Sequence, residues 1–443
     1  MQESTWKAQR PPSAELEEAA FLPILEAEAG EFLGLARSLL ATPPRDWSPA
    51  QVYRLYQVCT ALETFLDDRG APENRTYAPL REMVAVLRWL ASALSSLMHL
   101  DARQGQYELP SGREAAARAY GEPIRKGALE VAARLQAGFR RLQEIWRGLG
   151  GAWPEVARSG SGLLPGAVPR LPRNLVAEEE AEGGDGPGSA RLVGSYLSVA
   201  ERFAESVPEP GERLEELRSW QERCFREEQA RSWEARVHNL QSVYDHVVAG
   251  RPEEREHPDF RSLRGCSSLA LHLLEAGTAL AHLYERHDLY GRRATRDLAA
   301  DVIPEEALLR LLARVCAGLA RRALLEGVPV ARSLLDRVVQ IESVELTVPE
   351  GLVLHARPAS LIVRVVQHHG VPVEMQIGGQ AAPADSMLQL LVLVGSHPEE
   401  RRIRFRGARR ALEDLQLLFE SGFGESGLER LPDRLAYLRH QAG

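Results

Sequence analysis

The sequence predicts a multidomain protein in which a large all-α region, built from a duplicated helical unit, precedes a small α+β domain. Leucine, alanine and arginine recur at three- and four-residue spacing through most of the chain, which is typical of helices. Later, short stretches alternate apolar and polar residues, which is typical of half-buried strands. A chain of 443 residues, 44% of them hydrophobic, is long enough for about two to four domains. We divide it into helical unit 1 (14–150), a linker (151–187), helical unit 2 (188–342), an α+β domain (343–424) and a C-terminal helical tail (425–443).

The helical region carries several local signals for helix starts. Ser48 and Gln51 form a predicted capping box around a proline at the first helical position. Ser111 and Glu114 form a second predicted box. Pro304 stands before two glutamates, and this acidic first turn predicts a third start. We therefore expect a helix to begin at each of these three places.

Glycine, proline and serine cluster between the two helical units, and the acidic run 178–182 follows them. This composition predicts a linker or a long loop between two lobes. The stretch from Gly211 to Val248 is expected to form one long helix, which would suit a scaffold or the seam of a dimer.

The two helical units look related at an offset of 183 residues, which predicts a pseudo-symmetric pair. A histidine, an arginine and a tyrosine at four-residue spacing occur in each unit: His99, Arg103 and Tyr107, then His282, Arg286 and Tyr290. Each trio is expected to share one helix face. The two faces could form a duplicated pocket for an anion or small ligand, or they could tie helices together. We favour the second interpretation, because no glycine-rich phosphate loop or carboxylate pair accompanies them.

Composition narrows the range of functions. The formal charge of −8 argues against nucleic acid or an anionic membrane as the main partner. The four cysteines are far apart, which excludes a Cys-x-x-Cys metal or redox motif and suggests a reducing compartment. No uninterrupted apolar run approaches the length of about 18 residues that a membrane span needs. We expect a cytoplasmic protein with no metal or cofactor.

The α+β domain is predicted from alternation and helical spacing taken in turn. Val344, Leu346 and Val348 alternate with polar residues and predict a first strand. The remaining expected elements are a helix from Ala356 to His369 that ends at Gly370, a strand from Val371 to Ile377, a turn at Gly378 and Gly379, a short helix from Ser386 to Gly395, a strand from Arg402 to Arg406 and a helix from Arg409 to Phe419. With a third strand after the turn at Gly378 and Gly379, the order is βαββαβα, an open-faced sandwich with the helices on one face of the sheet.

One motif in this domain stands out. Leu354-His355-Ala356-Arg357-Pro358-Ala359 places a histidine just before a helix that carries proline in its first turn. Ser386 follows His355 by 31 residues and precedes an apolar run. This combination resembles HPr, the histidine phosphocarrier of the bacterial phosphoenolpyruvate:sugar phosphotransferase system. The resemblance covers about a fifth of the chain, from about Ser343 to Gly424.

The resemblance implies that His355 accepts a phosphoryl group from phosphorylated enzyme I and passes it to an enzyme IIA-like protein. Histidine side chains suit this role because a neutral, nucleophilic form is abundant near neutral pH. Arg357 would screen the charge of the phosphate. The helix start itself favours an anion, because its backbone N–H groups have no partner within the helix. The protein would then be a carrier of phosphoryl groups, not a stand-alone enzyme.

The resemblance also implies where partners and regulators act. Ser386 occupies the position of the family's regulatory serine, but we favour a plain helix cap there, since Asp385 would oppose a second anion. The residues expected to contact phosphotransferase partners are Pro358, Arg364, Met387 and Leu388. Val353 stands where a glycine is usual in the family, which would stiffen the loop that leads to the site.

We recognise no family for the helical region. We expect it to bind a partner or act as a sensor, and it could mediate a homodimer. This would give the carrier a regulatory role more than one in bulk sugar uptake. An alternative is a non-catalytic scaffold that uses a degenerate HPr-like domain for docking. A helical enzyme that uses the repeated His, Arg and Tyr residues ranks last, because no nucleophile–base pair or metal set can be named. The tail from Leu428 to Leu438 is expected to form a small helix against the helical region.

Overall fold

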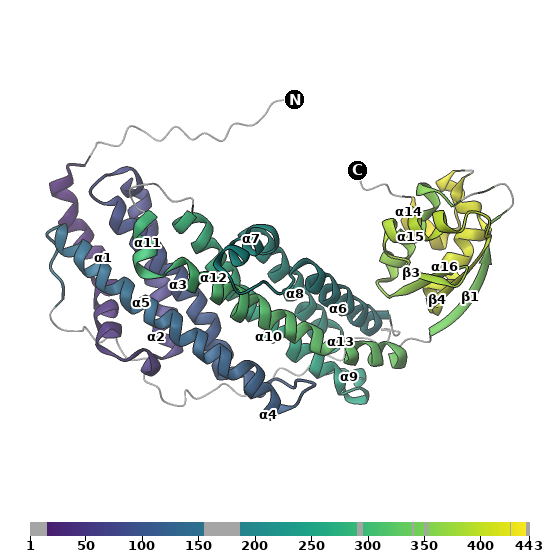
Figure 1. Cartoon of the computed structure of the whole chain (residues 1–443), viewed down its shortest axis with the longest axis horizontal. Helices are drawn as coiled ribbons and strands as arrows, with labels where there is room; N and C mark the ends of the chain where they lie inside the picture. The colour runs from purple at the N-terminus through teal and green to yellow at the C-terminus, as the bar shows by residue number, and fades with distance from the viewer. Residues whose placement is uncertain are drawn as a thin grey trace. The chain divides into compact units, whose positions relative to one another are not determined.

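A computed structural model describes residues 16–154, 187–289, 296–338, 341–349, 352, 354–425 and 427–439 (Figure 1). The chain forms two compact units, and each draws on segments from both predicted halves of the helical region. Unit 1 comprises Met1–His99, Ile124–Pro169 and Ala276–Leu312, and unit 2 comprises Leu100–Pro123, Arg170–Glu275 and Ala313–Gly443. The pairing of 14–150 with 188–342 as a sequence duplication stays a prediction, and most of the predicted linker lies outside the described residues.

Long helices make up the described part of unit 1. It holds all or most of α1 (Glu18–Ala41), α2 (Pro49–Asp68), α3 (Ala78–Arg103), α5 (Glu122–Gly148), α11 (Arg296–Val302) and α12 (Glu305–Arg310). The helical part of unit 2 holds all or most of α4 (Arg113–Ala116), α6 (Pro187–Ser206), α7 (Leu214–Cys224), α8 (Glu227–Val247), α9 (Pro252–Glu256), α10 (Asp259–His282) and α13 (Gly318–Val338). In unit 2, α6 packs between α8 and α13, and the hydroxyl of Tyr196 donates a hydrogen bond of 2.9 Å to the carbonyl of Leu324.

A helix begins within two residues of each of the three predicted starts, although one predicted capping box does not form. Helix α2 begins after Ser48, whose hydroxyl accepts the N–H of Gln51 at 3.2 Å, while the Gln51 side chain accepts the N–H of Ser48 at 2.8 Å. Helix α12 begins directly after Pro304. The box at Ser111 is wrong: α4 begins at Arg113, and the N–H of Ser111 donates to the carboxylate of Glu326 at 2.8 Å. A distant carboxylate satisfies this N–H group in place of the local Glu114 side chain.

The single long helix expected from Gly211 to Val248 is also wrong. It is two helices, α7 and α8, because the chain leaves the helical conformation at Phe225, where φ is −143° and ψ is 47°. Phe225 is fully buried and stacks on Trp220 with ring centroids 5.4 Å apart. The burial of this aromatic side chain accompanies the break between the two helices. The spacing of apolar residues in the sequence does not predict that break.

The expected faces of His, Arg and Tyr do not form as predicted. Helix α3 ends at Arg103, and Tyr107 lies beyond a 3-10 turn, so the first trio does not share one helix face. His282 ends α10, Arg286 lies in the π-helical turn that follows, and Tyr290 lies outside the described residues. The His282 ring stacks on Trp89 of α3 with centroids 3.9 Å apart. This contact ties α3 to the end of α10 within unit 1.

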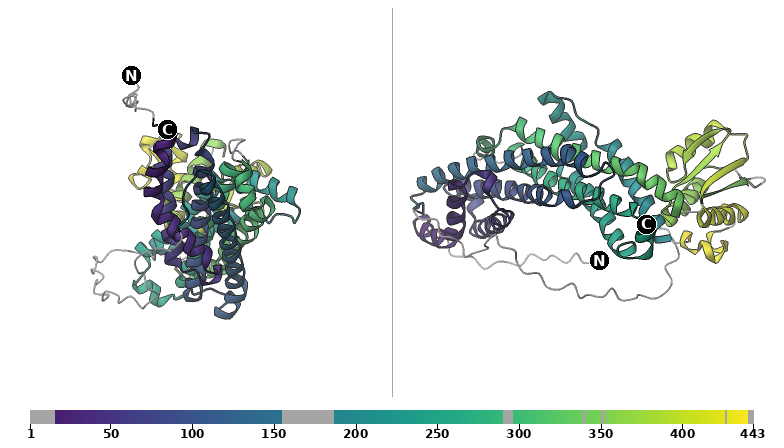
Figure 2. Two further views of the ribbon diagram at one scale, coloured as in Figure 1. Left: turned by 90° about the vertical axis from the view of Figure 1, so that its left-hand side faces the viewer. Right: turned by 90° about the horizontal axis from the view of Figure 1, so that it is seen from below.

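The C-terminal domain has the predicted order of elements. These are β1 (Ile341–Thr347), α14 (Ala356–His369), β2 (Val373–Ile377), β3 (Gln380–Pro383), α15 (Met387–Ser396), β4 (Arg402–Ala408) and α16 (Arg409–Glu420). The strands form one antiparallel sheet in the order β1-β4-β2-β3. The helices cover one face of this sheet (Figures 1 and 2). We call residues 341–439 the carrier domain, after the role that the resemblance implies.

The sheet register separates a buried face from an exposed one. Phe405 of β4 pairs with Val344 of β1 and with Met375 of β2, and it packs on Phe419 of α16 at 5.6 Å between ring centroids. The alternate residues of β4 are exposed arginines. The predicted turn between β2 and β3 is confirmed, with φ of 57° at Gly378 and 83° at Gly379, as tight hairpins require. The predicted open-faced sandwich is therefore correct.

The segment after α16 belongs to the carrier domain. Residues 427–439, which we call the C-terminal strap, contain two 3-10 turns, Leu428–Arg430 and Asp433–Leu438, in place of the predicted small helix. Leu431, Leu435 and Leu438 are buried, and the second turn contacts α14 and α16. The expectation that this tail packs on the helical region is therefore corrected, because its apolar residues are buried against the carrier domain.

One stretch of the described chain, Ala78–Gln106, is long and apolar enough to cross a membrane by length and composition. Within it, 61% of the most apolar window is buried inside the structure, as in the core helix of a folded domain.

We expect Leu435→Ala to destabilise the carrier domain by about 2–5 kcal/mol, because the substitution leaves a cavity at a fully buried site. The measurement is the free energy of opening, obtained from hydrogen exchange of the α16 amides. The matched control is Leu388→Ala, since the Leu388 side chain is 73% exposed and its loss should change stability by less than about 0.5 kcal/mol. Equal effects of the two substitutions would contradict a role of the strap in this core.

Candidate functional site

His355 sits at the start of α14 and caps it. Its backbone is extended, with φ of −108° and ψ of −169°, and its carbonyl accepts the N–H of Ala359 at 3.1 Å. The Nδ1 atom accepts the backbone N–H of Arg357 at 3.3 Å. Pro358 is the third residue of the helix, where the missing N–H has no intrahelical partner to lose. The imidazole is therefore held at a helix N-terminus, and its side chain is 57% exposed.

Glu425 also lies at this site, although it follows α16 near the other end of the domain's sequence. One of its carboxylate oxygens lies 3.8 Å from Nε2 of His355, and the other lies 3.6 Å from Nη1 of Arg357. Arg357 also donates a long hydrogen bond of 3.4 Å to the carbonyl of Gly424. Sequence reasoning missed Glu425, because a loop after α16 brings it close and no local motif marks it.

This arrangement supplies a nucleophile and an anion-binding environment. The Nδ1 lone pair of His355 faces the first N–H groups of α14, where the helix dipole favours negative charge. The Arg357 guanidinium adds a forked donor of opposite charge to a phosphate. A phosphate on His355 would compete with Glu425 for this guanidinium. The site can therefore hold a covalently bound anion, and the Glu425 carboxylate opposes that state by repulsion.

Ser386 occupies the N-cap position of α15, as predicted, but its side chain makes no capping hydrogen bond. Its carbonyl accepts the N–H of Leu390 at 3.0 Å, so the helix begins there through the backbone. Met387 is half-buried, whereas Leu388 is 73% exposed. Val392, one turn later, is 61% exposed. Sequence reasoning missed Val392, although its four-residue spacing from Leu388 could have revealed an exposed apolar pair.

Arg364 lies on α14 in contact with the strap. Its guanidinium donates a hydrogen bond of 3.1 Å to the carbonyl of Tyr437. The Tyr437 ring stacks on His368 with centroids 3.6 Å apart, and its hydroxyl donates to Asp414 at 2.9 Å. The role of Arg364 in partner binding stays a prediction. Its side chain also binds the strap through this hydrogen bond.

Asp414 is the buried centre of these contacts. His369 Nε2 lies 2.9 Å from its carboxylate, and Arg434 of the strap forms an ion pair with it. Burial alone would raise the pKa of Asp414, but the hydrogen bonds from His369 and Tyr437 outweigh it and hold that pKa below its ordinary value of 3.8. Burial, followed by the charge of His369, lowers the pKa of His368 from 6.5. In the part of the chain that the structure describes, no cluster of three or more His, Cys, Asp or Glu side chains suits a metal ion.

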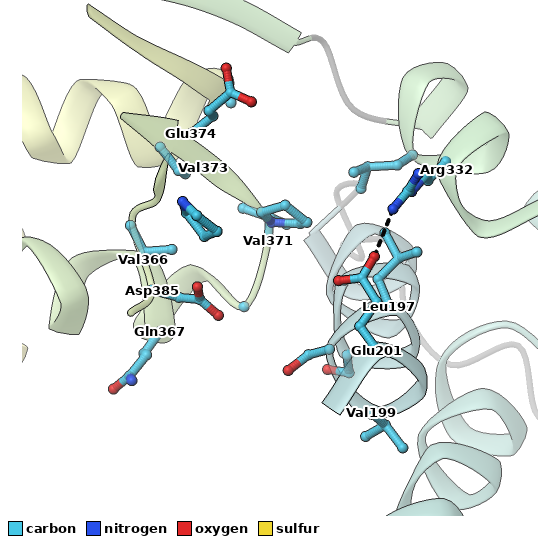
Figure 3. A pocket seen from close by; sticks show the side chains of 18 of the residues that line it. Leu197, Val199, Glu201, Arg332, Val366, Gln367, Val371, Val373, Glu374 and Asp385 are labelled. Carbon is cyan, nitrogen blue, oxygen red and sulfur yellow. Dashed lines mark hydrogen bonds and ion pairs between the residues drawn. The ribbon is translucent and has the colours of Figure 1, made fainter. Parts of the chain in front are cut away.

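Unit 2 also contains a cleft of about 870 Å³ (Figure 3). Its walls come from α6, α8 and α13 and, in the carrier domain, from the end of α14, the loop after it, and strands β2, β3 and β4. Arg332 donates to Glu201 at 2.9 Å along one wall, and Asp385 lies on the other. His355, Arg357 and Ser386 do not line it.

Acid should weaken the attachment of the strap. The pKa of Asp414 is lowered in the folded state. The stability that its carboxylate contributes is therefore complete above about pH 4 and is lost as the pH falls through the folded-state pKa. The lowered pKa of His368 acts in the same direction, since protonation below pH 6.5 favours the open strap. We expect Asp414→Asn to cost about 1–3 kcal/mol at pH 7 and progressively less as the pH falls below about 4.

The measurement for this prediction is the free energy of strap opening, from hydrogen exchange corrected for the intrinsic rate at each pH. Asp433→Asn is the matched control, because the Asp433 side chain is 99% exposed and should contribute little at any pH. A penalty for Asp414→Asn that is the same at pH 7 and pH 3 would contradict this account.

Comparisons with known proteins agree with this geometry. The family model for the PTS HPr component phosphorylation site matches residues 342–421. The phosphocarrier protein HPr of Chlamydia pneumoniae is 34% identical over 94 residues, which cover 20% of this chain and 87% of that protein. No solved structure matches the chain. Through this C-terminal domain, whose exposed histidine caps α14 in a βαββαβα sandwich, the chain belongs to the HPr family.

Proposed function

We propose that this protein is a modular phosphocarrier of a bacterial phosphotransferase system that works in the cytoplasm. His355 accepts a phosphoryl group from phosphorylated enzyme I and passes it to an enzyme IIA-like acceptor. The observation that carries the proposal is the exposed imidazole at the start of α14, with Nδ1 directed at the N–H groups of the first turn. Membership of the HPr family supports the same role.

The chemistry follows from the orientation of the imidazole. In the neutral form with its proton on Nε2, the Nδ1 lone pair attacks the phosphorus atom of the donor. The bond from phosphorus to the donor breaks as the new P–N bond forms, and the donor atom keeps the electron pair. The backbone N–H of Arg357 and the Arg357 guanidinium would then stabilise the transferred phosphate. Transfer to the acceptor reverses these events.

Partner proteins would dock beside this histidine. Pro358 lies in the first turn of α14, and Met387 and Leu388 open α15, which packs against α14. Large exposed apolar side chains on a small domain are typical of docking surfaces, and Leu388 and Val392 form such a pair. Arg364 would add positive charge at the rim. Ser386 is retained as a candidate regulatory site, with Asp385 as the charge that opposes its phosphorylation.

The helical region would serve as a partner-binding or sensor module that gives the carrier a regulatory output. Its size favours regulation, because a bulk carrier gains little from so large an attachment. We include homodimer formation through this region in the proposal. We expect neither nucleic acid nor a membrane as a partner, since the net charge is −8.

Incubation with enzyme I and labelled phosphoenolpyruvate should label the wild-type protein with an acid-labile, base-stable phosphate. His355→Ala should lose at least about 99% of this label, because no other nucleophile occupies the start of α14. His238→Ala is the matched control, since this histidine lies exposed on α8 and should leave labelling unchanged. Circular dichroism of the variants would exclude loss of fold.

Two results would contradict the proposal. Labelling of His355→Ala at the wild-type level would assign the phosphate to another residue. Absence of label in the wild-type protein with several enzyme I proteins would favour the scaffold alternative. In that case, His355→Ala should also leave the binding of partner proteins unchanged.

A further inference from the structure

Helix α6 of the helical region makes a close backbone contact with the carrier domain within unit 2. Gly194 faces the loop that follows α14, and a Cβ atom at this position would overlap the carbonyl oxygen of Gly370. The same Cβ would lie 3.2 Å from Cδ of Pro372 and from Cα of Val371. Only glycine allows two backbones to approach this closely without displacement.

Charged side chains flank this contact. Arg202, two turns further along α6, forms an ion pair of 3.4 Å with Asp385 of the carrier domain. On the other side, the side chain of Arg191 lies against Gly370, which ends α14. A cation there complements the negative end of the α14 dipole. One helix thus contacts two separate segments of the carrier domain.

The phosphorylation site lies at the opposite end of the same helix. Helix α14 has 14 residues, so its cap at His355 and its end at Gly370 are separated by about 20 Å. With α6 in contact with Gly370, the His355 side chain is still 57% exposed and Leu388 is 73% exposed. The cleft beside α6 does not include either residue.

We propose that α6 is the docking surface for the carrier domain of its own chain, centred on Gly194, and that the carrier exchanges phosphoryl groups while it is docked. The helical region and a phosphotransferase partner would then occupy opposite ends of α14 at the same time. Docking itself stands on the contacts at Gly194 and Arg202. The claim of simultaneous exchange rests on the proposed function.

The test uses the full chain with Gly194→Leu, which places a side chain against the loop backbone. Hydrogen exchange of residues 370–373 should become at least about tenfold faster, while the α6 amides keep their protection. Gly30→Leu is the matched control, because a Cβ atom on Gly30 meets no atom within 4 Å. Arg202→Asp should accelerate the same exchange by about two- to fivefold, and adding Asp385→Arg should restore it, as expected for an exposed ion pair.

Phosphorylation by enzyme I separates the two claims. Gly194→Leu should be phosphorylated at a rate within about twofold of the wild type. A change of more than about tenfold in this phosphorylation rate would overturn the claim that the docked carrier domain exchanges phosphoryl groups. It would leave the claim of docking in place. Unchanged hydrogen exchange at residues 370–373 in Gly194→Leu would overturn the claim of docking. Protection that disappears on dilution of the wild-type protein would assign the contact to a second copy of the chain and contradict docking within one chain. The hydrogen-exchange test of docking remains valid even if no enzyme I labels the wild-type protein.

Discussion

The start of α14 at His355 is the constraint on which the carrier domain depends. The apolar face of this helix, with Leu361, Ile362, Val365 and Val366, must lie against the sheet. Each residue turns a helix by about 100°, so a shift of one residue would turn this face away from the core. The burial of that face therefore fixes where the first turn points. It also leaves the imidazole of His355 in solvent.

The charges around this start are brought together by the rest of the domain. Arg357 follows His355 along the chain, but Glu425 arrives after three more strands and two more helices. The strap that follows Glu425 is anchored by buried leucines and by the polar contacts at Asp414. This anchoring holds the end of α16 and the loop after it against α14. The electrostatics of the site thus depend on packing at the other end of the helix.

Paired charges also lie inside unit 1. Glu63 is 7% exposed and is paired with Arg88 and with Arg81, while buried His287 lies 2.6 Å from Glu82. Buried charges are costly without partners, and a pair is strongly destabilised when one member is removed. Such networks fix how helices pack.

The sequence by itself determined the class of each part, the order βαββαβα and the positions of His355, Arg357 and Ser386. It could do so because alternation, helical spacing and the motif at the start of α14 are local signals. It could not reveal Glu425, the break at Phe225 or the partner of Ser111, since each depends on residues far away in the chain. The same holds for the strap, whose buried leucines lie in a segment that contacts α14 and α16. Tertiary structure decided these features, because burial and charge pairing act between surfaces that meet only after the chain has folded.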